Sequence, residues 1–348
     1  MASDKESYDQ LNVVPRRRIP WRMLLLGIAV SATLLYLLMR QLEKGDWARI
    51  WDVLAGLNPW WMAVPIAGGL LSAILRPWRW QKIFPEESHP GYRPCFAALS
   101  VGNMTNNLVP ARGGDLLRCF MISRDKSLAG ASLALATLGL EKVLDGLALL
   151  AVLLISFLFV SPPRVLGAMG LIGGMIFGGA FFAIILLHYR TRWFLSVTRL
   201  IFRTVRLEAL GERVATLFEW FAQGLGAVSS PATMTELAIL TILIWAGDTF
   251  AIWGLALSLH LSVSVAGCLL VSAAIGLSQM VPSAPAAVGP YEAASVAALM
   301  LLRVKLASAM ALTVLMHGWG ILATVILGMA GLWLNGNIWS GIEVGKFN

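Results

Sequence analysis

Long stretches without a charged residue alternate with short polar segments along the chain. Residues 23–39, 53–75, 165–187 and 306–342 contain no Asp, Glu, Lys or Arg. Each is about long enough to cross a hydrocarbon core of roughly 30 Å, and backbone groups within lipid must bond to one another, so such stretches form helices. The pattern predicts an all-α polytopic membrane protein with about six full transmembrane helices, at 21–40, 59–76, 127–163, 165–188, 233–259 and 306–334.

The third of these predicted helices contains a charged patch. Residues 127–163 are hydrophobic except for Glu141, Lys142 and Asp145. The part before the patch, 127–140, is too short to span a membrane alone, which favours one long helix. Two short crossings are the alternative, and they would change the orientation of everything that follows.

Helix-breaking residues interrupt the hydrophobic pattern at NNLVPARGGDLLR. Pro110 ends the preceding helix. Gly113 and Gly114 open a new one with Asp115 in its first turn, where a carboxylate suits the positive end of the helix dipole. Basic residues on both sides place both ends in the cytoplasm. The unit is therefore predicted to be a re-entrant hairpin at about 94–124.

A second interruption, QMVPSAPAAVGPYE, has the same character. Pro282, Pro285 and Gly289 break a hydrophobic run, and Glu292 opens the next helix. A second re-entrant hairpin is predicted at about 263–303.

The two interruptions show weak internal similarity. Glu141 lies 26 residues after Asp115, and His317 lies 25 residues after Glu292. Counted from a cytoplasmic N-terminus, the first hairpin enters from the cytoplasm and the second from the opposite side. Related units of opposite orientation are typical of secondary transporters, whose substrate sites lie near the midplane at broken helices. An inverted-repeat arrangement is therefore predicted, although two basic residues after the second hairpin would then lie outside, against the charge rule.

Composition supports a membrane protein and excludes other classes. Hydrophobic residues make up 58% of the chain and charged residues 13%, against about 25% charged residues in a soluble domain. The net charge of +8 comes from short basic runs beside hydrophobic segments, which follow the positive-inside rule and indicate no nucleic-acid partner. The three cysteines are interpreted as packing residues, and the four histidines form no metal motif.

We expect three parts: a basic cytoplasmic tail at 1–20, a flippase-like transmembrane domain at 21–334 and a short tail at 335–348. The first apolar run lacks a signal-peptide cleavage site. The crossings then place both termini in the cytoplasm, with the protein in a prokaryotic cytoplasmic (inner) membrane. Within the domain, a cytoplasmic amphipathic helix is predicted at about 189–228, because arginines occupy one face and apolar side chains another.

The first interruption supplies a candidate site for a lipid phosphate. Arg112 and Arg118 are suited to it because a guanidinium binds phosphate through two parallel hydrogen bonds. The N–H groups of Gly113 and Gly114, at a helix start, add to an anion site. Asn107 is a further candidate contact, although asparagines in such a segment more often bond broken backbone. The alternative is that both arginines are ordinary loop residues that follow the charge rule.

Four acidic residues are candidates for charge or proton coupling. Glu141 and Asp145 are four residues apart and share a helix face, and an ionised carboxylate there costs about 2.5–3.5 kcal/mol on insertion scales. The pair therefore needs a cationic or proton partner. It is a proton-coupling site, a partner for one of the two arginines, or a static ion pair that fixes the hairpin. Asp115 is the third candidate, and Glu292 is a weaker fourth, which is also suited to capping its helix. Asp248 is a weak case of the same kind.

Two groups of motifs make the chain similar to a known family. N-x-x-P-x-R-G-G-D-x-x-R at 107–118, followed by E-K-x-x-D at 141–145, resembles the lysylphosphatidylglycerol synthase transmembrane-region family, also called flippase-like membrane proteins. P-x-x-P-x-x-x-G-x-x-E at 282–292 matches the second signature of that family. The resemblance covers about 20–334, nearly the whole chain.

The resemblance implies movement of a lipid between leaflets. In multidomain members this region is joined to a soluble aminoacyl-transferase domain, which makes an aminoacylated lipid that the membrane part is thought to move. Because this chain ends at Asn348, translocation without lipid synthesis is expected. The chain departs from the family pattern at 285–287, Pro-Ala-Ala where members often have Pro-Gly-Gly, and at 141–142, Glu-Lys where they usually have Glu-Arg. The first departure reduces backbone freedom in the second hairpin.

Three functions fit these features. The first is a translocase for an anionic, aminoacylated or polyprenyl-phosphate-linked lipid. The second is a membrane-embedded enzyme on a lipid-linked substrate, with Asp115, Glu141 and Asp145 as acid, base or metal ligands. No HExxH, GxSxG or ATP-binding motif supports it. The third is a non-catalytic partner of a lipid synthase or glycosyltransferase. We expect the translocase and not an enzyme, so no catalytic residue, cofactor or metal is expected. The expected partner is a membrane phospholipid or a lipid-linked substrate. The sequence does not indicate an oligomeric state.

Overall fold

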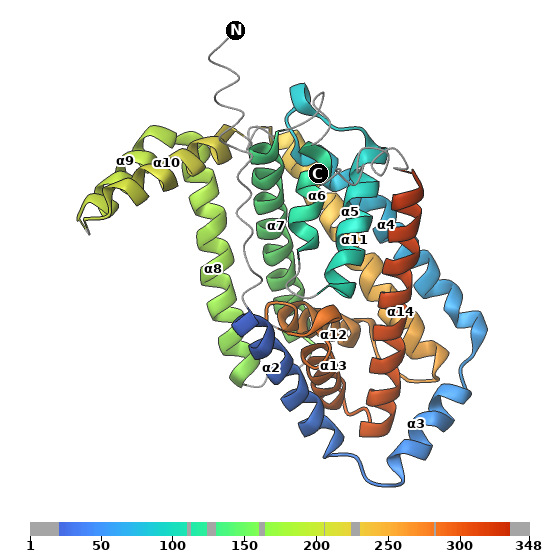
Figure 1. Cartoon of the computed structure of the whole chain (residues 1–348). Helices are drawn as coiled ribbons and strands as arrows, with labels where there is room; N and C mark the ends of the chain where they lie inside the picture. The colour runs from blue at the N-terminus through green and yellow to red at the C-terminus, as the bar shows by residue number, and fades with distance from the viewer. Residues whose placement is uncertain are drawn as a thin grey trace, which may run out of the picture.

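The computed structural model describes residues 21–109, 113–123, 130–159, 164–204, 206–223, 230–281 and 283–334. Every regular element within these ranges is helical (Figure 1), which confirms the all-α class for the described part of the chain. The α-helices are α2 (Trp21–Met39), α3 (Asp46–Ala55), α4 (Ala63–Ile83), α5 (Tyr92–Leu108), α6 (Gly114–Ser123), α7 (Ala131–Phe157), α8 (Arg164–Tyr189), α9 (Thr191–Thr204), α10 (Glu208–Gln223), α11 (Pro231–Ser258), α12 (Val265–Ser278), α13 (Pro290–Leu301) and α14 (Leu306–Leu334). Short 3-10 helices are η1 (Pro59–Met62), η2 (Glu86–Ser88) and η5 (Pro285–Ala287). The predicted tails at 1–20 and 335–348, and the site candidates Pro110, Arg112 and Pro282, lie outside the described residues.

Helices cover all six predicted transmembrane regions: α2, α4, α7, α8, α11 and α14. Among the described residues, α11, α14 and the Leu171–Tyr189 part of α8 are each long and apolar enough to cross a membrane. The segment from α3 through η1 to α4 is bent by 77° and would add a fourth span. The protein is therefore a multi-pass membrane protein. The number of six spans stays a prediction, because the apolar part of α2, Leu25–Met39, is shorter than a full span.

The charged patch lies within one continuous helix. α7 runs for 27 residues without a break, so the alternative of two short crossings is wrong for the described part of this segment. The patch lies in the middle of α7, and an uninterrupted apolar stretch follows it.

Each predicted hairpin contains a pair of helices that pack against each other, α5 with α6 and α12 with α13. α5 ends at Leu108 because Val109, which precedes Pro110, takes extended backbone angles (φ −109°, ψ 133°), and α6 begins at Gly114. After α12, η5 and Gly289 lead into α13. In Figure 1 the α5–α6 pair lies in the upper half of the molecule and the α12–α13 pair in the lower half, and η5 contacts α5. An inverted repeat requires such opposed halves, while the repeat itself and re-entrant insertion stay predictions.

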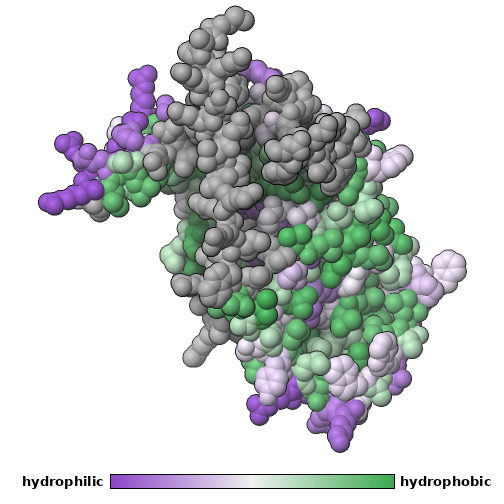
Figure 2. Space-filling view, in the orientation of Figure 1, coloured by the Kyte–Doolittle hydropathy of each residue, from purple (hydrophilic) through white to green (hydrophobic). Residues whose placement is uncertain are grey.

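The predicted amphipathic helix is two helices. α9 and α10 form an antiparallel pair that projects from the body at the end of α8 (Figure 1). Phe194 packs edge-on against Phe218, with ring centroids 5.2 Å apart. The pair turns at Arg206, which has a positive φ of 59°. Figure 2 shows hydrophilic side chains at this end and at the lower rim, with hydrophobic side chains over much of the face between them.

Two large hydrophobic clusters fill the interior, beside a small third cluster of Leu75, Leu240 and Ile244. One lies in the lower half, between α7, α11, α12, α13 and α14, and the other in the upper half, around Trp80, Leu140 and Leu237. The cysteines Cys95, Cys119 and Cys268 are buried free thiols, which confirms their interpretation as packing residues.

Helix α4 packs along α11 through two glycines. A Cβ on Gly247 would lie 3.0 Å from the carbonyl O of Gly68, and a Cβ on Gly68 would overlap the carbonyl O of Gly247. Small residues let two backbones approach closely in this way. The approach brings α4 near enough to α11 for polar side chains of both helices to meet.

We expect Gly68→Ala to lower the free energy of unfolding by about 1–3 kcal/mol, because overpacking forces the helices apart. The measurement is thermal unfolding of the purified protein in detergent. Gly69→Ala is the matched control, because a Cβ there would meet no atom within 4 Å. Equal losses for the two variants would contradict the close packing at Gly68.

Candidate functional site

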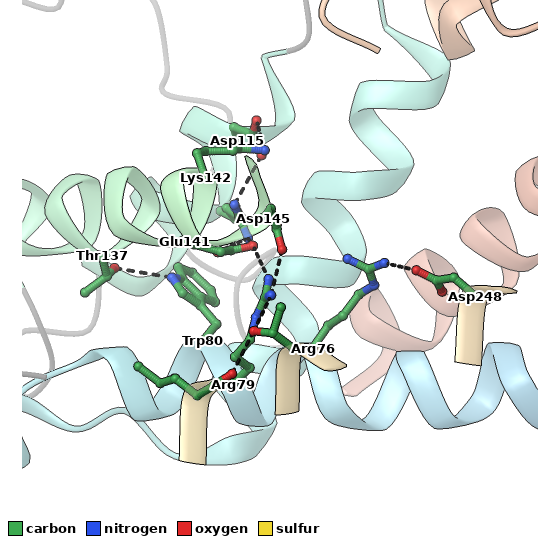
Figure 3. Close-up of polar contacts among 12 residues, drawn as sticks. Arg76, Arg79, Trp80, Asp115, Thr137, Glu141, Lys142, Asp145 and Asp248 are labelled. Atoms are coloured by element: carbon green, nitrogen blue, oxygen red, sulfur yellow. Dashed lines mark hydrogen bonds and ion pairs between the residues drawn. The ribbon is translucent and has the colours of Figure 1, made fainter. Parts of the chain in front are cut away.

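A buried ion network joins α4, α6 and α7. Arg79 contacts Asp145 through Nη1 and Oδ1 at 2.6 Å and Glu141 through Nη2 and Oε1 at 3.7 Å. Arg118 contacts the other carboxylate oxygen of Glu141, Nη1 to Oε2, at 3.0 Å. Glu141 thus lies between two arginines from different helices, which precede it by 62 and 23 residues in the sequence. Figure 3 shows Glu141, Asp145 and Arg79 meeting where α7 crosses α4.

Neutral side chains complete this network. Trp80 lies under Arg118, with the guanidinium carbon 4.9 Å from the ring centroid, a distance that suits a cation–π contact. The indole N–H of Trp80 donates to Thr137 Oγ1 at 3.2 Å. Arg79 donates to Thr241 Oγ1 on α11 at 3.2 Å. Residues from four helices therefore enclose the two guanidinium groups, and only 1% of the Arg79 side chain and 2% of the Arg118 side chain are exposed.

A second, more accessible layer of ion pairs lies beside the buried one. Arg76 on α4 contacts Asp248 on α11 at 2.5 Å, and Ser72 donates to the same carboxylate at 2.7 Å. Lys142 contacts Asp115 at 3.0 Å. About a third of the Arg76 and Asp248 side chains is exposed, so this layer can be reached from outside the helix packing.

The charges of the two layers balance. The cations are Arg76, Arg79, Arg118 and Lys142, and the anions are Asp115, Glu141, Asp145 and Asp248. Charged groups that leave water are costly unless they are paired and hydrogen-bonded, which explains why acidic and basic side chains alternate here.

A cavity of about 810 Å³ lies next to the accessible layer. Its walls come from α4, α5, α6, α7, α8, α11, α12, α13 and α14. Lys142 and Asp145 line it from the middle of α7, and Leu149 from the following turn. α11 runs in the same direction as α7 in Figure 1, and along it the charged Asp248 precedes the apolar Leu255, which also lines the cavity. The cavity is therefore charged at one end and largely apolar along the rest.

The second hairpin contains a polar contact of its own. His317 Nδ1 on α14 lies 2.5 Å from Glu292 Oε1, and the other oxygen of Glu292 accepts a hydrogen bond from the N–H of Gly289 at 2.6 Å. Glu292 therefore caps α13, as one interpretation of the sequence expected, and it also binds a group on the next helix. Of the two pairs at similar spacing in the sequence, Glu292 and His317 are in contact. Asp115 contacts Lys142, the neighbour of Glu141, and not Glu141 itself.

Comparison with protein families decides the identity. A family model described as the lysylphosphatidylglycerol synthase TM region matches residues 24–328. The chain belongs to this family. The resemblance carried by the motifs is thus confirmed over most of the chain, and the family description associates this membrane protein with lipid metabolism. Comparisons with curated proteins and with solved structures give no match.

In this member of the lysylphosphatidylglycerol synthase TM region family, the glycines of the first hairpin serve its packing. A Cβ on Gly102 would lie 2.7 Å from the carbonyl O of Gly114. The N–H of Gly114 donates to Asn106 Oδ1 at 2.8 Å, so an asparagine bonds broken backbone, as the sequence indicated. For Gly113 and Asn107, phosphate binding stays a prediction.

The placement of Arg118 favours one of the alternatives that the sequence left open. It is an ion-pair partner of Glu141, and its second guanidinium nitrogen lies 3.4 Å from Asp115. Because this guanidinium is buried and already paired, a phosphate would have to displace a carboxylate to reach it. Phosphate binding by Arg118 therefore stays a prediction that requires the network to open.

The residues predicted from the sequence did not include Arg76, Arg79 and Trp80, which belong to the site. Arg76 and Arg79 resemble ordinary basic residues at a cytoplasmic helix end, and Trp80 resembles an interface aromatic. The interface interpretation is wrong for Trp80, which is fully buried. One available signal was the acidic pair on α7, which required cations that Arg118 alone does not supply.

Removing Arg79 leaves Asp145 without its ion-pair partner and leaves Glu141 with Arg118 alone. We expect Arg79→Met to lower the free energy of unfolding by about 3–5 kcal/mol, because a buried charge loses its counter-ion. Chemical denaturation of the detergent-solubilised protein measures this change. Adding Asp145→Asn to Arg79→Met should restore part of the loss.

Lys82→Met is the control for that experiment. Lys82 forms an ion pair with Glu236 at 3.2 Å between the same two helices, α4 and α11, that hold Arg79 and Thr241, but both side chains are about one-third exposed. Such a pair contributes roughly 0–1 kcal/mol. Similar losses in Lys82→Met and Arg79→Met would contradict the role assigned to the buried network.

Proposed function

We propose that this protein moves a lipid between the two leaflets of the cytoplasmic membrane. The cargo class is an anionic or aminoacylated phospholipid, or a polyprenyl-phosphate-linked lipid. The observation that carries the proposal is the cavity that is charged at one end and apolar along the rest, because a lipid has the same division between headgroup and chain. Its volume of about 810 Å³ falls within the range of about 300–1,000 Å³ that is usual for ligand cavities.

The charged end of the cavity suits a phosphate headgroup. Arg76 and Lys142 line the cavity and are more exposed than the cations of the buried network. Arginine offers a planar pair of N–H donors for phosphate oxygens, and lysine offers a mobile point charge. In this proposal Arg118 and Arg79 hold the helices in place, and Arg76 and Lys142 meet the headgroup.

The apolar part of the cavity suits a lipid chain. It is lined by Leu149, Ile252, Leu255, Trp319 and Ala323 from three different helices. Such walls accept any hydrocarbon chain, so they support a lipid ligand without selecting its chemical identity. Selection between lipids falls to the charged end.

Both hairpins border the cavity near their turns. Asn103 and Asp115 belong to the first hairpin, and Gln279 and Tyr291 to the second. Broken helices beside a central site are typical of transporters that work by alternating access. We therefore include the inverted repeat in the proposal, with the two hairpins as the parts that change position. Both termini lie in the cytoplasm in this proposal. A lipid synthase or glycosyltransferase is the class of protein that supplies the cargo.

Reconstitution into vesicles with labelled lipids tests the proposal. Gly320 lines the cavity and Gly318 does not, although a Cβ at either position would meet no atom within 4 Å. We expect Gly320→Leu to narrow the cavity and to reduce lipid movement roughly tenfold or more. The reason is that the leucine side chain occupies space that the lipid chain would need. Gly318→Leu, two residues away on the same helix, should move lipid at the wild-type rate.

A variant at the charged end completes the test. Arg76→Ala should reduce movement of phosphate-bearing lipids, whereas Lys82→Ala, which removes a cation outside the cavity, should not. Absence of protein-dependent movement across a broad lipid panel would overturn the proposal. Formation of a chemically altered lipid by the purified protein would favour an enzyme instead.

A further inference from the structure

The contact between Glu292 and His317 has a defined proton requirement. The second ring nitrogen, His317 Nε2, lies 3.0 Å from the carbonyl O of Ala286. A carbonyl oxygen only accepts hydrogen bonds, so Nε2 carries a proton. Nδ1 faces a carboxylate oxygen at 2.5 Å, and a hydrogen bond at that distance needs one further proton between the two atoms.

That further proton can be assigned to either partner with the same result. If it belongs to the imidazole, a cationic His317 faces an ionised Glu292. If it belongs to the carboxyl group, a neutral His317 accepts from a protonated Glu292. When the proton leaves, the neutral imidazole has a single N–H and cannot donate to Ala286 O and Glu292 at the same time, so one of the two hydrogen bonds is lost. The pair therefore binds one exchangeable proton.

The pair holds a turn with an unfavourable backbone. We call residues 283–289 the tip of the second hairpin. Ala286 and Ala287 have φ values of 56° and 58°, and Gly289 has a φ of 97°. The left-handed region is unfavourable for residues with a Cβ, so the two alanines, which stand where family members often have glycines, need contacts that keep them there.

Three hydrogen bonds with side chains connect the tip to its surroundings. His317 donates to the carbonyl O of Ala286, Glu292 accepts from the N–H of Gly289, and Ser31 Oγ on α2 accepts from the N–H of Ala284 at 2.9 Å. Two of the three bonds involve the proton-binding pair. The position of the pair is thus tied directly to the conformation of the tip.

The environment of the pair is almost free of other charges. Tyr291 stacks on the His317 ring, with centroids 4.1 Å apart, and the two paired side chains are only 11% and 13% exposed. α12 and α14 contain no Asp, Glu, Lys or Arg, and Cys268 on α12 is a buried thiol. Tyr36 lies toward the C-terminal end of α2, and Tyr92, Arg93 and Cys95 lie in the first turn of α5. Asp46 on α3 and Asp248 on α11 have ion-pair partners of their own, Arg49 and Arg76.

We propose that Glu292 and His317 form a proton-binding site whose occupancy sets how firmly the tip is held against α14. With the proton bound, the pair fastens the tip. When the pH rises and the proton leaves, one of the two His317 hydrogen bonds that hold the tip and α13 against α14 is lost, and the tip loosens. Tyr291, which covers His317, also lines the cavity, so a change at the pair reaches the cavity wall.

Histidine NMR of the whole protein in detergent tests the site itself. The chain has four histidines, so selective isotope labelling of histidine gives four imidazoles, and His317→Gln identifies the signal of interest. In Glu292→Gln the titration midpoint of His317 should move, while those of His89, His188 and His260 should not. Four midpoints that are unchanged in Glu292→Gln would overturn the proposed site.

Hydrogen exchange of the tip amides tests the coupling to conformation. After correction for the intrinsic pH dependence of exchange, the tip should exchange roughly tenfold faster or more on the high-pH side of the His317 titration, because a charge-assisted hydrogen bond is lost. In Glu292→Gln this pH response should vanish, since an amide can donate to Nδ1 at any pH. A tip whose exchange follows pH equally in wild type and Glu292→Gln would overturn the coupling.

Ser31→Ala is the control for a tip that is merely destabilised. It removes the third hydrogen bond and leaves the proton-binding pair intact. The tip should exchange faster at every pH and keep the wild-type pH response. Loss of that response in Ser31→Ala would contradict the assignment of the proton to Glu292 and His317. Neither measurement uses lipid movement, so the result stands whether or not the protein moves lipids.

Discussion

Glu141 lies between Arg79 and Arg118, and the upper half of the structure depends on this bridge. A single carboxylate links α7 to α4 and to α6, the second helix of the first hairpin. Each of the three charges would be unfavourable alone in apolar surroundings, so each helix needs the other two. The stacked Trp80 and the hydroxyls of Thr137 and Thr241 fix the same arrangement from the side. The close packing of α4 on α11 adds to this arrangement. It brings Thr241 to Arg79 and Asp248 to Arg76.

The second hairpin follows the same physical logic with weaker groups. An acidic residue in the first turn of its second helix satisfies backbone N–H groups and also binds a side chain on the following long helix. In the first hairpin that partner is a lysine, with arginine nearby, and in the second it is a histidine. A histidine changes charge in a pH range where arginine and lysine do not. The first hairpin is therefore held by permanent charges, and the second by a contact that depends on a proton.

Much of the architecture could be predicted because it depends on local sequence. Hydrophobic length fixes where helices lie, Pro110 and its extended neighbour Val109 fix where α5 ends, and the acidic residues of α7 required partners. The identity of those partners could not be predicted in the same way. Arg79 meets Glu141 only because α4 crosses α7, and nothing in the periodicity of either segment states which helices are neighbours. Likewise, a basic residue near a helix end satisfies the charge rule equally well whether it faces water or a buried carboxylate.

The balance of four cations and four anions has a consequence for any charged ligand. A headgroup that enters the cavity finds no spare charge of either sign among these residues, since each one already has a partner. Entry must therefore proceed by exchange, in which the ligand replaces one internal partner as that partner is released. Because exchange keeps the number of unpaired charges low at every step, its barrier would be far smaller than the cost of stripping water from a bare ion. A site built in this way would be selective through the rate of exchange as well as through affinity.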